Sequence, residues 1–513
     1  MGLVLHSIGL ATYGFAVAVL SLGIFVFGPE ARSQGLEARR PLIFVPGLLG
    51  SRLCRPDPAK PTEMQVAWGT LGALPRFPSI RLSHDQTHVP DDIKPCGLVR
   101  EIVYLGLFTQ QVYAPVLRHL EQLGYRENHD LFIFDYDWRR SIFDNAEALD
   151  RFVTDKTPNR RVDILAHSMG GLVARVYTAK HGGAERVARL ISAGTPFLGS
   201  IKVYETVEKG WGALNVAMGG LPAFRRTMLS FPAVFELMPR YAACCEGDAG
   251  SSKFVPANPE GWSALGWDGV DIATMPNLPA TFTRIRALEE IIATRLPHGV
   301  EDVVLVGVDQ RTSQRVGFER HRGATVVRVQ STWAGDGTVV RESAALPRAT
   351  LHPTSFADHE RILHDPQIQD FLRVALTKSV SEALDIVAVR PRGNILTIDG
   401  SVTELVGIVV EPGEPIYRTG DLCKVHVHVR LGSQQKLSPQ SIKLTRRMPD
   451  GRAAKITLKP DPAASDPSNP FEQSFVGTFE AGVKPGNGML RAVVNMAGEK
   501  ARVVERPVPV IAR

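Results

Sequence analysis

This chain of 513 residues has little cysteine, and only one of its segments is long and apolar enough to cross a bilayer. Its five cysteines include no Cys-x-x-Cys pair, so no structural zinc site is expected. A single apolar segment excludes a polytopic membrane protein. With 44% hydrophobic and 22% charged residues, the chain also differs from disordered and coiled-coil proteins. The composition predicts a globular protein, and the length predicts two or three domains.

The charged residues form no dense basic clusters with interleaved aromatics, the pattern typical of nucleic-acid binding. The net charge is +6, and most of the excess lies after Asp385, where 18 Lys and Arg stand against 13 Asp and Glu. We therefore expect no nucleic-acid partner. A mildly basic surface of this kind is compatible with weak attraction to anionic lipid.

The amino-terminal segment has no Asp, Glu, Lys or Arg before Glu30, and Ile8–Phe27 is a run of 20 uncharged, mostly apolar residues. Residues 1–33 are therefore predicted to be a signal peptide or a membrane anchor. Ala31-Arg32-Ser33 has the small residues that a signal peptidase reads. The arginines that follow the apolar run count against simple translocation. We expect export to the outside or the periplasm, or anchoring in a membrane.

Between residues 40 and 378, short apolar segments alternate with helical ones. Strands are predicted at Pro41–Val45, Leu131–Phe134, Arg161–Leu165, Val187–Ala193, Val303–Val308 and Thr325–Val329. This alternation is typical of an α/β fold with a mostly parallel sheet, in which function lies at the carboxyl ends of the strands. An apolar insertion at about 200–275 is a candidate cap over the site, or simply a segment that packs on the core.

The pattern changes from Asp385 onward. Lys424–Leu431 alternates strictly between polar and apolar residues, and turns rich in Pro, Gly, Asp and Ser separate further short strands. Residues 385–513 are predicted to form an all-β sandwich of immunoglobulin-like type. His426 and His428 are expected on one outward strand face, where a metal site is the weaker interpretation.

Ser168 stands between a predicted strand and a predicted helix. Ala166-His-Ser-Met-Gly-Gly171 follows Val162–Leu165, and its small residues allow the strand and the helix to pass closely. This is the nucleophile elbow of an α/β-hydrolase fold, with Ala166 in place of the usual first glycine. Ser168 is predicted to be the nucleophile, and the N–H of Met169 to stabilise an oxyanion.

Such a serine needs an acid and then a histidine further along the chain. Asp336 follows the predicted strand Thr325–Val329 and is the preferred acid, with Asp309 as the alternative. For the base, His359 precedes the last predicted helix. His352 and His364 are nearby alternatives, of which His364 has the sequence of a helix start.

The second oxyanion donor is expected in the loop that follows the first core strand. The glycine turn Pro46-Gly-Leu48 would bring the N–H of Leu48 toward the nucleophile. An ordinary turn that ends the strand is the alternative.

Several motifs occur along the chain in a characteristic order. They are Pro46-Gly-Leu-Leu-Gly-Ser51, Phe134-Asp-Tyr-Asp-Trp-Arg139, Ala166–Gly171, Gly194-Thr-Pro-Phe-Leu-Gly-Ser200 and Gly335-Asp-Gly-Thr-Val339. Together they resemble the lecithin:cholesterol acyltransferase family, with its phospholipase A2-type and diacylglycerol acyltransferase relatives. The resemblance covers about residues 40–376. It implies the triad Ser168, Asp336 and His359, with an oxyanion hole formed by Leu48 and Met169.

The resemblance also implies a mobile lid at about residues 54–96, closed by a disulfide between Cys54 and Cys96, with Trp68 touching lipid. Phe231–Tyr241 is similar to the family's cap signature. The module after Asp385 is not part of the family pattern. The adjacent Cys244 and Cys245 are not expected to bond each other.

The expected activity is acyl transfer from a lipid ester through Ser168 to an alcohol or to water, at a membrane or lipid surface. No metal or other cofactor is expected. A serine esterase acting on a non-lipid ester is the alternative enzyme, and a catalytically silent protein that binds through its β-module is the alternative outside enzymes. A metal hydrolase using His84, Asp85 and His88 is disfavoured, because no helix aligns these ligands.

Overall fold

The structure is a computed structural model. The residues that it describes are 39–82, 92–104, 108–212, 214–241, 244–247, 278–321, 324–346, 354–355, 357–378, 405–412, 417–431, 438–462, 472–484, 486–495 and 502–512. The predicted leader, residues 1–33, lies outside these ranges. Within them, no helix combines the length and apolarity needed to cross a membrane.

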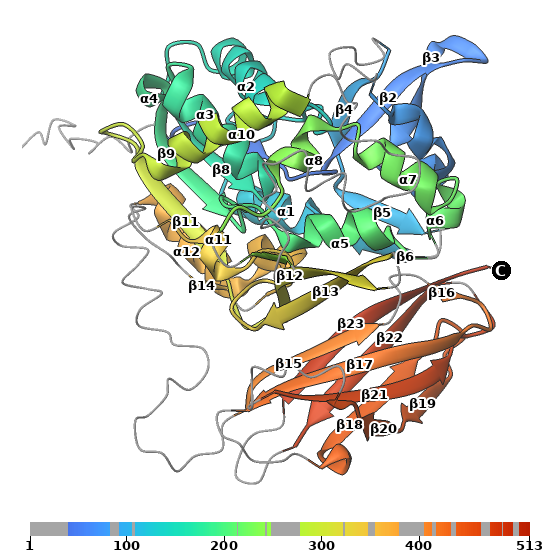
Figure 1. The fold of residues 1–513 in the computed structure, drawn as a ribbon. Helices are drawn as coiled ribbons and strands as arrows, with labels where there is room; N and C mark the ends of the chain where they lie inside the picture. The colour runs from blue at the N-terminus through green and yellow to red at the C-terminus, as the bar shows by residue number, and fades with distance from the viewer. Residues whose placement is uncertain are drawn as a thin grey trace, which may run out of the picture. The chain divides into compact units, whose positions relative to one another are not determined.

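A parallel sheet forms the centre of the amino-terminal part (Figure 1). Its strands are β1 (Leu42–Val45), β7 (Leu131–Ile133), β8 (Val162–His167), β9 (Val187–Ala193), β11 (Glu301–Gly307) and the short β14 (Thr354–Ser355). The order is β14-β11-β9-β8-β1-β7, and every neighbouring pair is parallel. β1 and β8 are buried along their whole length, and accordingly β1 is a continuous apolar run and β8 is apolar except for Asp163 and His167. The predicted α/β class with a parallel sheet is confirmed.

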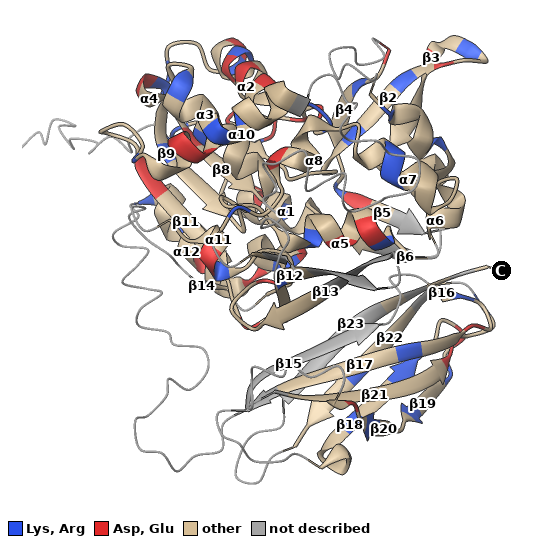
Figure 2. Cartoon of the chain, in the orientation of Figure 1, with Lys and Arg blue, Asp and Glu red and all other residues tan. Residues whose placement is uncertain are grey.

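Helices pack against both faces of this sheet. They are α1 (Ala114–Gln122), α2 (Ile142–Lys156), α3 (Met169–Lys180), α4 (Gly183–Arg186), α10 (Leu278–Ala293), α11 (Arg341–Ala344) and α12 (Pro366–Thr377), with the 3-10 helix η3 (His359–His364) before α12. The helices α2, α3 and α10 contribute to one buried apolar cluster, and α1 and α12 to another. Acidic and basic side chains are mixed along α2 and α4 (Figure 2).

Two sets of elements outside the sheet correspond to the predicted lid and cap. The predicted lid, about residues 54–96, contains β3 (Lys60–Trp68) and η1 (Leu71–Ile80) and is bounded by β2 (Ser51–Asp57) and β4 (Lys94–Leu98). Its residues 83–91 lie outside the described residues, and β5 (Glu101–Tyr104) and β6 (Phe108–Gln111) follow it. The predicted cap contains α5 (Ile201–Lys209), α6 (Leu214–Ala217), α7 (Leu221–Met228), α8 (Pro232–Glu236) and β10 (Cys245–Gly247). The predicted cap residues 248–275 lie outside the described residues.

One predicted strand lies elsewhere than expected. Thr325–Val329 falls within β13 (Ala324–Thr332), which pairs antiparallel with β12 (Thr312–His321) in a separate sheet of order β10-β12-β13. A two-residue connection joins β12 to β13, and so short a connection pairs consecutive strands antiparallel. The strand therefore lies outside the parallel sheet.

The amino ends of the central strands are joined by ion pairs around the buried side chain of Arg189. Arg189 on β9 contacts Asp163 on β8 at 3.3 Å and Glu301 on β11 at 2.6 Å. It also donates to the carbonyl of Ala375 on α12, and Arg40 contacts Asp163 at 3.0 Å. This network ties three strands and a helix together at the edge opposite the functional loops.

The carboxyl-terminal part is all-β apart from the short 3-10 helix η4 (Pro439–Ser441). One sheet has the order β15-β17-β21-β20 and the other β16-β23-β22-β18-β19. The strands are β15 (Leu405–Pro412), β16 (Tyr417–Arg418), β17 (Leu422–Leu431), β18 (Ile442–Arg447), β19 (Ala453–Ile456), β20 (Leu458–Pro460), β21 (Glu472–Glu480), β22 (Gly486–Val494) and β23 (Arg502–Ile511). The all-β module is as expected, and its immunoglobulin-like topology stays a prediction.

The two histidines of β17 differ from each other in burial. Val425, Val427 and Val429 fill the core of the module, as alternation predicts. His428 is nevertheless only 1% exposed and shares a 2.7 Å hydrogen bond with Ser474, whereas His426 is half-buried. The expectation of two outward, solvent-facing histidines is therefore wrong for His428. Among the described residues, no three His, Cys, Asp or Glu side chains are grouped to hold a metal ion.

Candidate active site

Ser168 lies at the turn between β8 and α3. Its backbone is in a rare left-handed conformation, with φ 54° and ψ −128°, which is costly for a residue with a side chain. Its N–H donates to Ala193 O at 2.8 Å, and its carbonyl accepts from Gly171 N at 3.0 Å. A β-carbon at Gly170 would lie 2.4 Å from Pro46 O, so this position requires glycine. The turn holds the Ser168 hydroxyl at the carboxyl edge of the sheet.

His359 connects Ser168 to a buried carboxylate. Its Nε2 lies 3.0 Å from Ser168 Oγ, and its Nδ1 lies 2.8 Å from Asp336 Oδ2. His359 begins η3, and its N–H donates to the carbonyl of Asp336 at 2.8 Å. The structure thus brings the predicted nucleophile, base and acid into one hydrogen-bonded chain. The alternative base His364 lies at the other end of η3, and His352 lies outside the described residues.

Asp336 is held rigidly and is fully buried. Its Oδ1 accepts from the N–H groups of Thr338 at 2.9 Å and Val339 at 2.7 Å, which leaves Oδ2 for His359. Its backbone forms a bridge with Gln310, just after β11, and a β-carbon at Gly307 would lie 2.3 Å from the Asp336 β-carbon. Asp336, the predicted acid, is therefore positioned by contacts with β11 and the residues just after it, whereas the sequence placed it at the end of the predicted strand Thr325–Val329. The alternative acid Asp309 precedes this bridge.

The pKa of His359 reflects two opposed effects. Burial lowers it, but the charge of Asp336 and the hydrogen bond to Asp336, with Glu360 and Asp358 nearby, raise it above the ordinary histidine value. Because a carbonyl or carboxylate cannot donate, the neutral ring carries its proton on Nδ1 and leaves Nε2 free to accept from Ser168. The geometry fits a general base.

The loop after β1 lies directly beside Ser168. Gly50 N donates to Gly47 O at 3.0 Å, which closes a tight turn over residues 47–50, named the oxyanion turn after its predicted role. Leu49 in this turn has φ 65°. Within the described part of the chain, the N–H groups of Leu48 and Met169 donate to no other protein atom. Met169 is also the first residue of α3, where the helix dipole favours negative charge. These two groups are open to stabilise an oxyanion.

The segment Phe134–Arg139 holds this loop from the side. Tyr136 Oη donates to Pro46 O at 2.8 Å, and Trp138 Nε1 donates to Ser51 O at 3.0 Å. Arg139 is fully buried and is bonded to Asp137 through two nitrogens. The motif therefore supports the loop.

Trp68 lies in a cluster of aromatic rings. Its ring centroid is 5.6 Å from those of Phe77, Trp138 and Trp211, and its Nε1 donates to Leu49 O at 2.9 Å. The side chain is half-buried and joins the predicted lid to the oxyanion turn. Contact of Trp68 with lipid stays a prediction.

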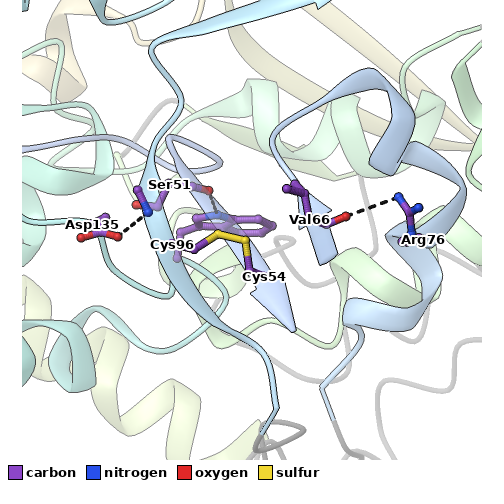
Figure 3. Close-up of a disulfide and its surroundings, with 8 residues drawn as sticks. Ser51, Cys54, Val66, Arg76, Cys96 and Asp135 are labelled. Atoms are coloured by element: carbon purple, nitrogen blue, oxygen red, sulfur yellow. Dashed lines mark hydrogen bonds between the residues drawn. A yellow bond between two sulfur atoms is a disulfide. The ribbon is translucent and has the colours of Figure 1, made fainter. Parts of the chain in front are cut away.

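Cys54 on β2 and Cys96 on β4 form a disulfide (Figure 3). The strands also pair antiparallel, with Cys54 opposite Lys94. Next to the disulfide, Gly97 N donates to Asp135 Oδ2 at 2.6 Å, and Arg76 on η1 reaches the carbonyl of Val66 at 3.4 Å. The two ends of the predicted lid are thus fixed to each other.

The remaining cysteines are Cys244, Cys245 and Cys423. Cys244 and Cys245 are bonded to each other, contrary to expectation, at the turn where Cys244 N donates to Tyr241 O at 3.0 Å. Cys423 is free and buried.

The predicted cap signature is anchored by Glu236. This side chain is fully buried and accepts hydrogen bonds from Ser141 Oγ at 2.6 Å and Ile142 N at 2.7 Å, at the start of α2. Burial raises its pKa to about 7, although these hydrogen bonds lower it. Glu236 therefore caps α2 from the neighbouring insertion.

Two residues at the site were not predicted from the sequence. Tyr113 and His167 are buried, and the Tyr113 hydroxyl lies 2.8 Å from His167 Nδ1. His167 adjoins Ser168, so its position in the motif was a signal. Tyr113 lies in a segment without a motif, and only the structure brings it to the site.

Comparison with known proteins supports the family suggested by the motifs. A family model described as lecithin:cholesterol acyltransferase matches residues 80–260. The chain is 26% identical over 206 residues to phospholipid:diacylglycerol acyltransferase 1 of Arabidopsis thaliana. This match covers 34% of this chain and 30% of that relative. The predicted resemblance is confirmed.

Solved structures of lipolytic proteins are also similar to this chain. The lipase BlEst2 of Bacillus licheniformis, in its propeptide form, has a TM-score of 0.30 at 12% identity and covers 92% of this chain and 94% of its own. The phospholipase PlaB of Legionella pneumophila has a TM-score of 0.25 at 10% identity, with 92% of each chain covered.

Proposed function

Because this chain is related to the lecithin:cholesterol acyltransferase family through residues 80–260, we propose that it is a serine-dependent lipid acyltransferase or lipase. The observation that carries the proposal is the chain Ser168–His359–Asp336, with distances of 3.0 Å and 2.8 Å. A nucleophile, a base and an orienting acid in this geometry are the requirements of acyl transfer.

In the first step, His359 Nε2 takes the proton of Ser168 while Oγ bonds to the ester carbonyl carbon. The N–H groups of Leu48 and Met169 stabilise the negative oxygen that forms. The carbon–oxygen bond to the donor alcohol then breaks, and His359 returns the proton to that alcohol. In the second step, an acceptor alcohol or water attacks the acyl-Ser168 intermediate by the same route and regenerates the serine.

Asp336 keeps the His359 ring in the tautomer that both steps need and stabilises its charged form. The proposed acyl donor is a lipid ester, which the enzyme meets at a membrane or lipid surface. The Cys54–Cys96 disulfide supports a location outside the cytoplasm, because disulfides persist in oxidising compartments. Export or anchoring through residues 1–33 is part of the same proposal.

The test uses a phospholipid labelled in its acyl chain, with and without a long-chain alcohol or sterol. Wild type is compared with Ser168→Ala and with a matched control, Ser192→Ala. The Ser192 hydroxyl is buried on β9 and has no hydrogen-bond partner among the described residues, so its removal should leave turnover unchanged.

An acyl ester product that depends on Ser168 would identify a transferase, and free fatty acid alone would identify a lipase. Turnover of a small ester without turnover of lipid would replace the lipid substrate with a non-lipid ester. Equal turnover by wild type and Ser168→Ala would contradict the proposed mechanism.

A further inference from the structure

A second chain of hydrogen bonds runs behind the three groups proposed for catalysis. Gly47 N lies 2.9 Å from Tyr113 Oη, Tyr113 Oη lies 2.8 Å from His167 Nδ1, and His167 Nε2 lies 2.9 Å from the carbonyl oxygen of His359. Tyr113 and His167 are only 5% and 6% exposed. The chain joins the oxyanion turn, the residue before the nucleophile and the backbone of the base.

The direction of each hydrogen bond follows from the chemistry of the partners. The His359 carbonyl can only accept, so His167 carries its proton on Nε2. In a neutral ring, Nδ1 then accepts, and the Tyr113 hydroxyl must donate to it. The remaining lone pairs of that hydroxyl accept from Gly47 N–H.

His167 is neutral at all ordinary pH values. Burial, with the charge of His359 and more weakly that of His364, lowers its pKa to about 3, although the hydrogen bond to the His359 carbonyl opposes this shift. Burial likewise raises the pKa of Tyr113, so its hydroxyl keeps its proton. The hydrogen-bond directions therefore stay the same while His359 gains and loses a proton.

We propose that Tyr113 and His167 are positioning residues, which hold the oxyanion turn and His359 at the distances from Ser168 that the reaction needs. This inference rests on the proposed function of Ser168. The Tyr113 hydroxyl and the His167 ring bridge segments that are 66, 54 and 192 residues apart in the chain. His167 is also the residue directly before Ser168 in the chain, so the same hydrogen bonds restrain the position of the nucleophile.

The hydrogen bond from Gly47 N to Tyr113 Oη matters for the position of the turn, because Gly47 has no side chain whose packing could fix its backbone. Leu48 N–H, the proposed oxyanion donor, is the next peptide group along the turn. An oxyanion donor works only at hydrogen-bond distance from the charge that forms in the transition state. Loss of the tether would therefore reduce the rate of the chemical step more than it would reduce substrate binding.

Two single variants break the same link from opposite sides. Tyr113→Phe removes the hydroxyl, and His167→Gln keeps an amide donor toward the His359 carbonyl but removes the Nδ1 acceptor. Each should lower kcat by about 10- to 100-fold, the cost of a small displacement at a reacting centre, and leave KM unchanged. The double variant should be no worse than the more severe single variant, because residues that act as a unit are not additive.

The matched control is Tyr177→Phe. Tyr177 lies on α3, is fully buried, and its hydroxyl has no hydrogen-bond partner among the described residues. This variant also loses one buried tyrosine hydroxyl, but away from the hydrogen bonds behind the site, and should keep wild-type kcat. Thermal unfolding of every variant shows whether a lower kcat comes from loss of fold.

The positioning role is tested by measuring two rates on the full chain. One is turnover of the labelled phospholipid. The other is covalent labelling by a fluorophosphonate, in which Ser168 Oγ bonds to phosphorus, fluoride leaves, and the serine proton passes to His359. We expect Tyr113→Phe and His167→Gln to slow both rates together while Tyr177→Phe slows neither.

Labelling and turnover of Tyr113→Phe at the wild-type rates would overturn the positioning role, as would a double variant whose losses multiply. If wild type is labelled at Ser168 but leaves lipid untouched, the lipid substrate is wrong, and the labelling rates still decide the positioning role. If wild-type Ser168 is not labelled at all, both proposals are overturned, because there is no reactive serine to position.

Discussion

Gly47 and Ser168 approach each other so closely that no side chain fits between them. A β-carbon built on Gly47 would lie 2.8 Å from the β-carbon of Ser168 and 3.3 Å from its Oγ. Neither residue can move away without cost in free energy, since Gly47 belongs to the oxyanion turn and Ser168 to the strained turn between β8 and α3. The absence of a side chain at Gly47 is therefore a requirement of the site.

Gly47→Ala should displace Ser168 and lower kcat by about 10- to 100-fold, since small displacements at a reacting centre have large effects on rate. The control is Gly72→Ala in η1, where an added β-carbon would meet nothing within 4 Å. Steady-state kinetics on an ester substrate measure both. Equal rates for Gly47→Ala and wild type would contradict the close approach.

Asp336→Asn should lower kcat by about 10³- to 10⁴-fold, the cost in other serine triads of losing the tautomer and the charge that the acid maintains. Asp309→Asn, at the alternative acid, is the matched control. Asp309 has φ 60°, which asparagine tolerates, so this variant should keep its activity. A larger loss at Asp309 than at Asp336 would reverse the assignment of the acid.

The rate should also depend on pH through His359. Its pKa is raised by Asp336, and only the neutral ring accepts the serine proton, so kcat should fall as the pH drops below that raised pKa. In Asp336→Asn the carboxylate is gone, so the residual activity should persist to lower pH. A pH–rate profile of both proteins checks the direction, and a shift toward higher pH would contradict it.

Glu236 should make stability depend on pH. Its pKa in the folded state is about 7, above its ordinary value of 4.5, because the carboxyl is buried. The protonated Glu236 carboxyl therefore contributes fully to the free energy of unfolding below pH 4.5, its ordinary pKa. This contribution, about 3 kcal/mol, is lost as the pH rises through the pKa of the folded state. Glu236→Gln should lack this loss and gain stability relative to wild type between pH 4 and 8.

Urea unfolding at several pH values measures the effect, and Glu147→Gln supplies the control. Glu147 lies on α2 with its side chain 61% exposed. This variant should follow the pH dependence of wild type. If the free energies of unfolding of wild type and Glu236→Gln depended on pH in the same way, burial would not raise the pKa of Glu236, and the prediction would be wrong.

The double variant Cys54→Ser, Cys96→Ser should lower the free energy of unfolding by about 3 to 4 kcal/mol. This is the contribution expected when a disulfide restricts the unfolded chain by closing a loop of this length. The bridged residues are 42 positions apart. Peptide mapping of the oxidised wild type locates the bond, and thermal unfolding measures its contribution. An unchanged transition would mean that pairing of β2 with β4 alone fixes the lid ends.

The core and the elbow were accessible from sequence because their signals are local. The mostly apolar segments at β1, β8 and β9 predicted strands buried on both faces, and Ser168 stood between a strand and a helix with small neighbours. Both features depend on residues a few positions apart. Periodicity and composition report such features directly.

The other features depend on contacts between distant segments. Thr325–Val329 was recognised as a strand, but its partner β12 could not be read from its own residues. His428 follows the alternation of β17 and yet is buried, because the environment of a strand's second face is set by tertiary packing. Tyr113 reaches His167 across 54 residues without a motif. Local pattern carries no information about such encounters.

The ion pairs around the buried Arg189 have a consequence for how this protein can change over evolutionary time. They close the amino edge of the parallel sheet, while Ser168, Asp336 and His359 occupy loops at the carboxyl edge. Substitutions at Arg189 or Asp163 would alter heat tolerance with little effect on chemistry, and changes in the opposite loops could alter substrate range with little effect on heat tolerance. The two edges of one sheet can thus adapt independently.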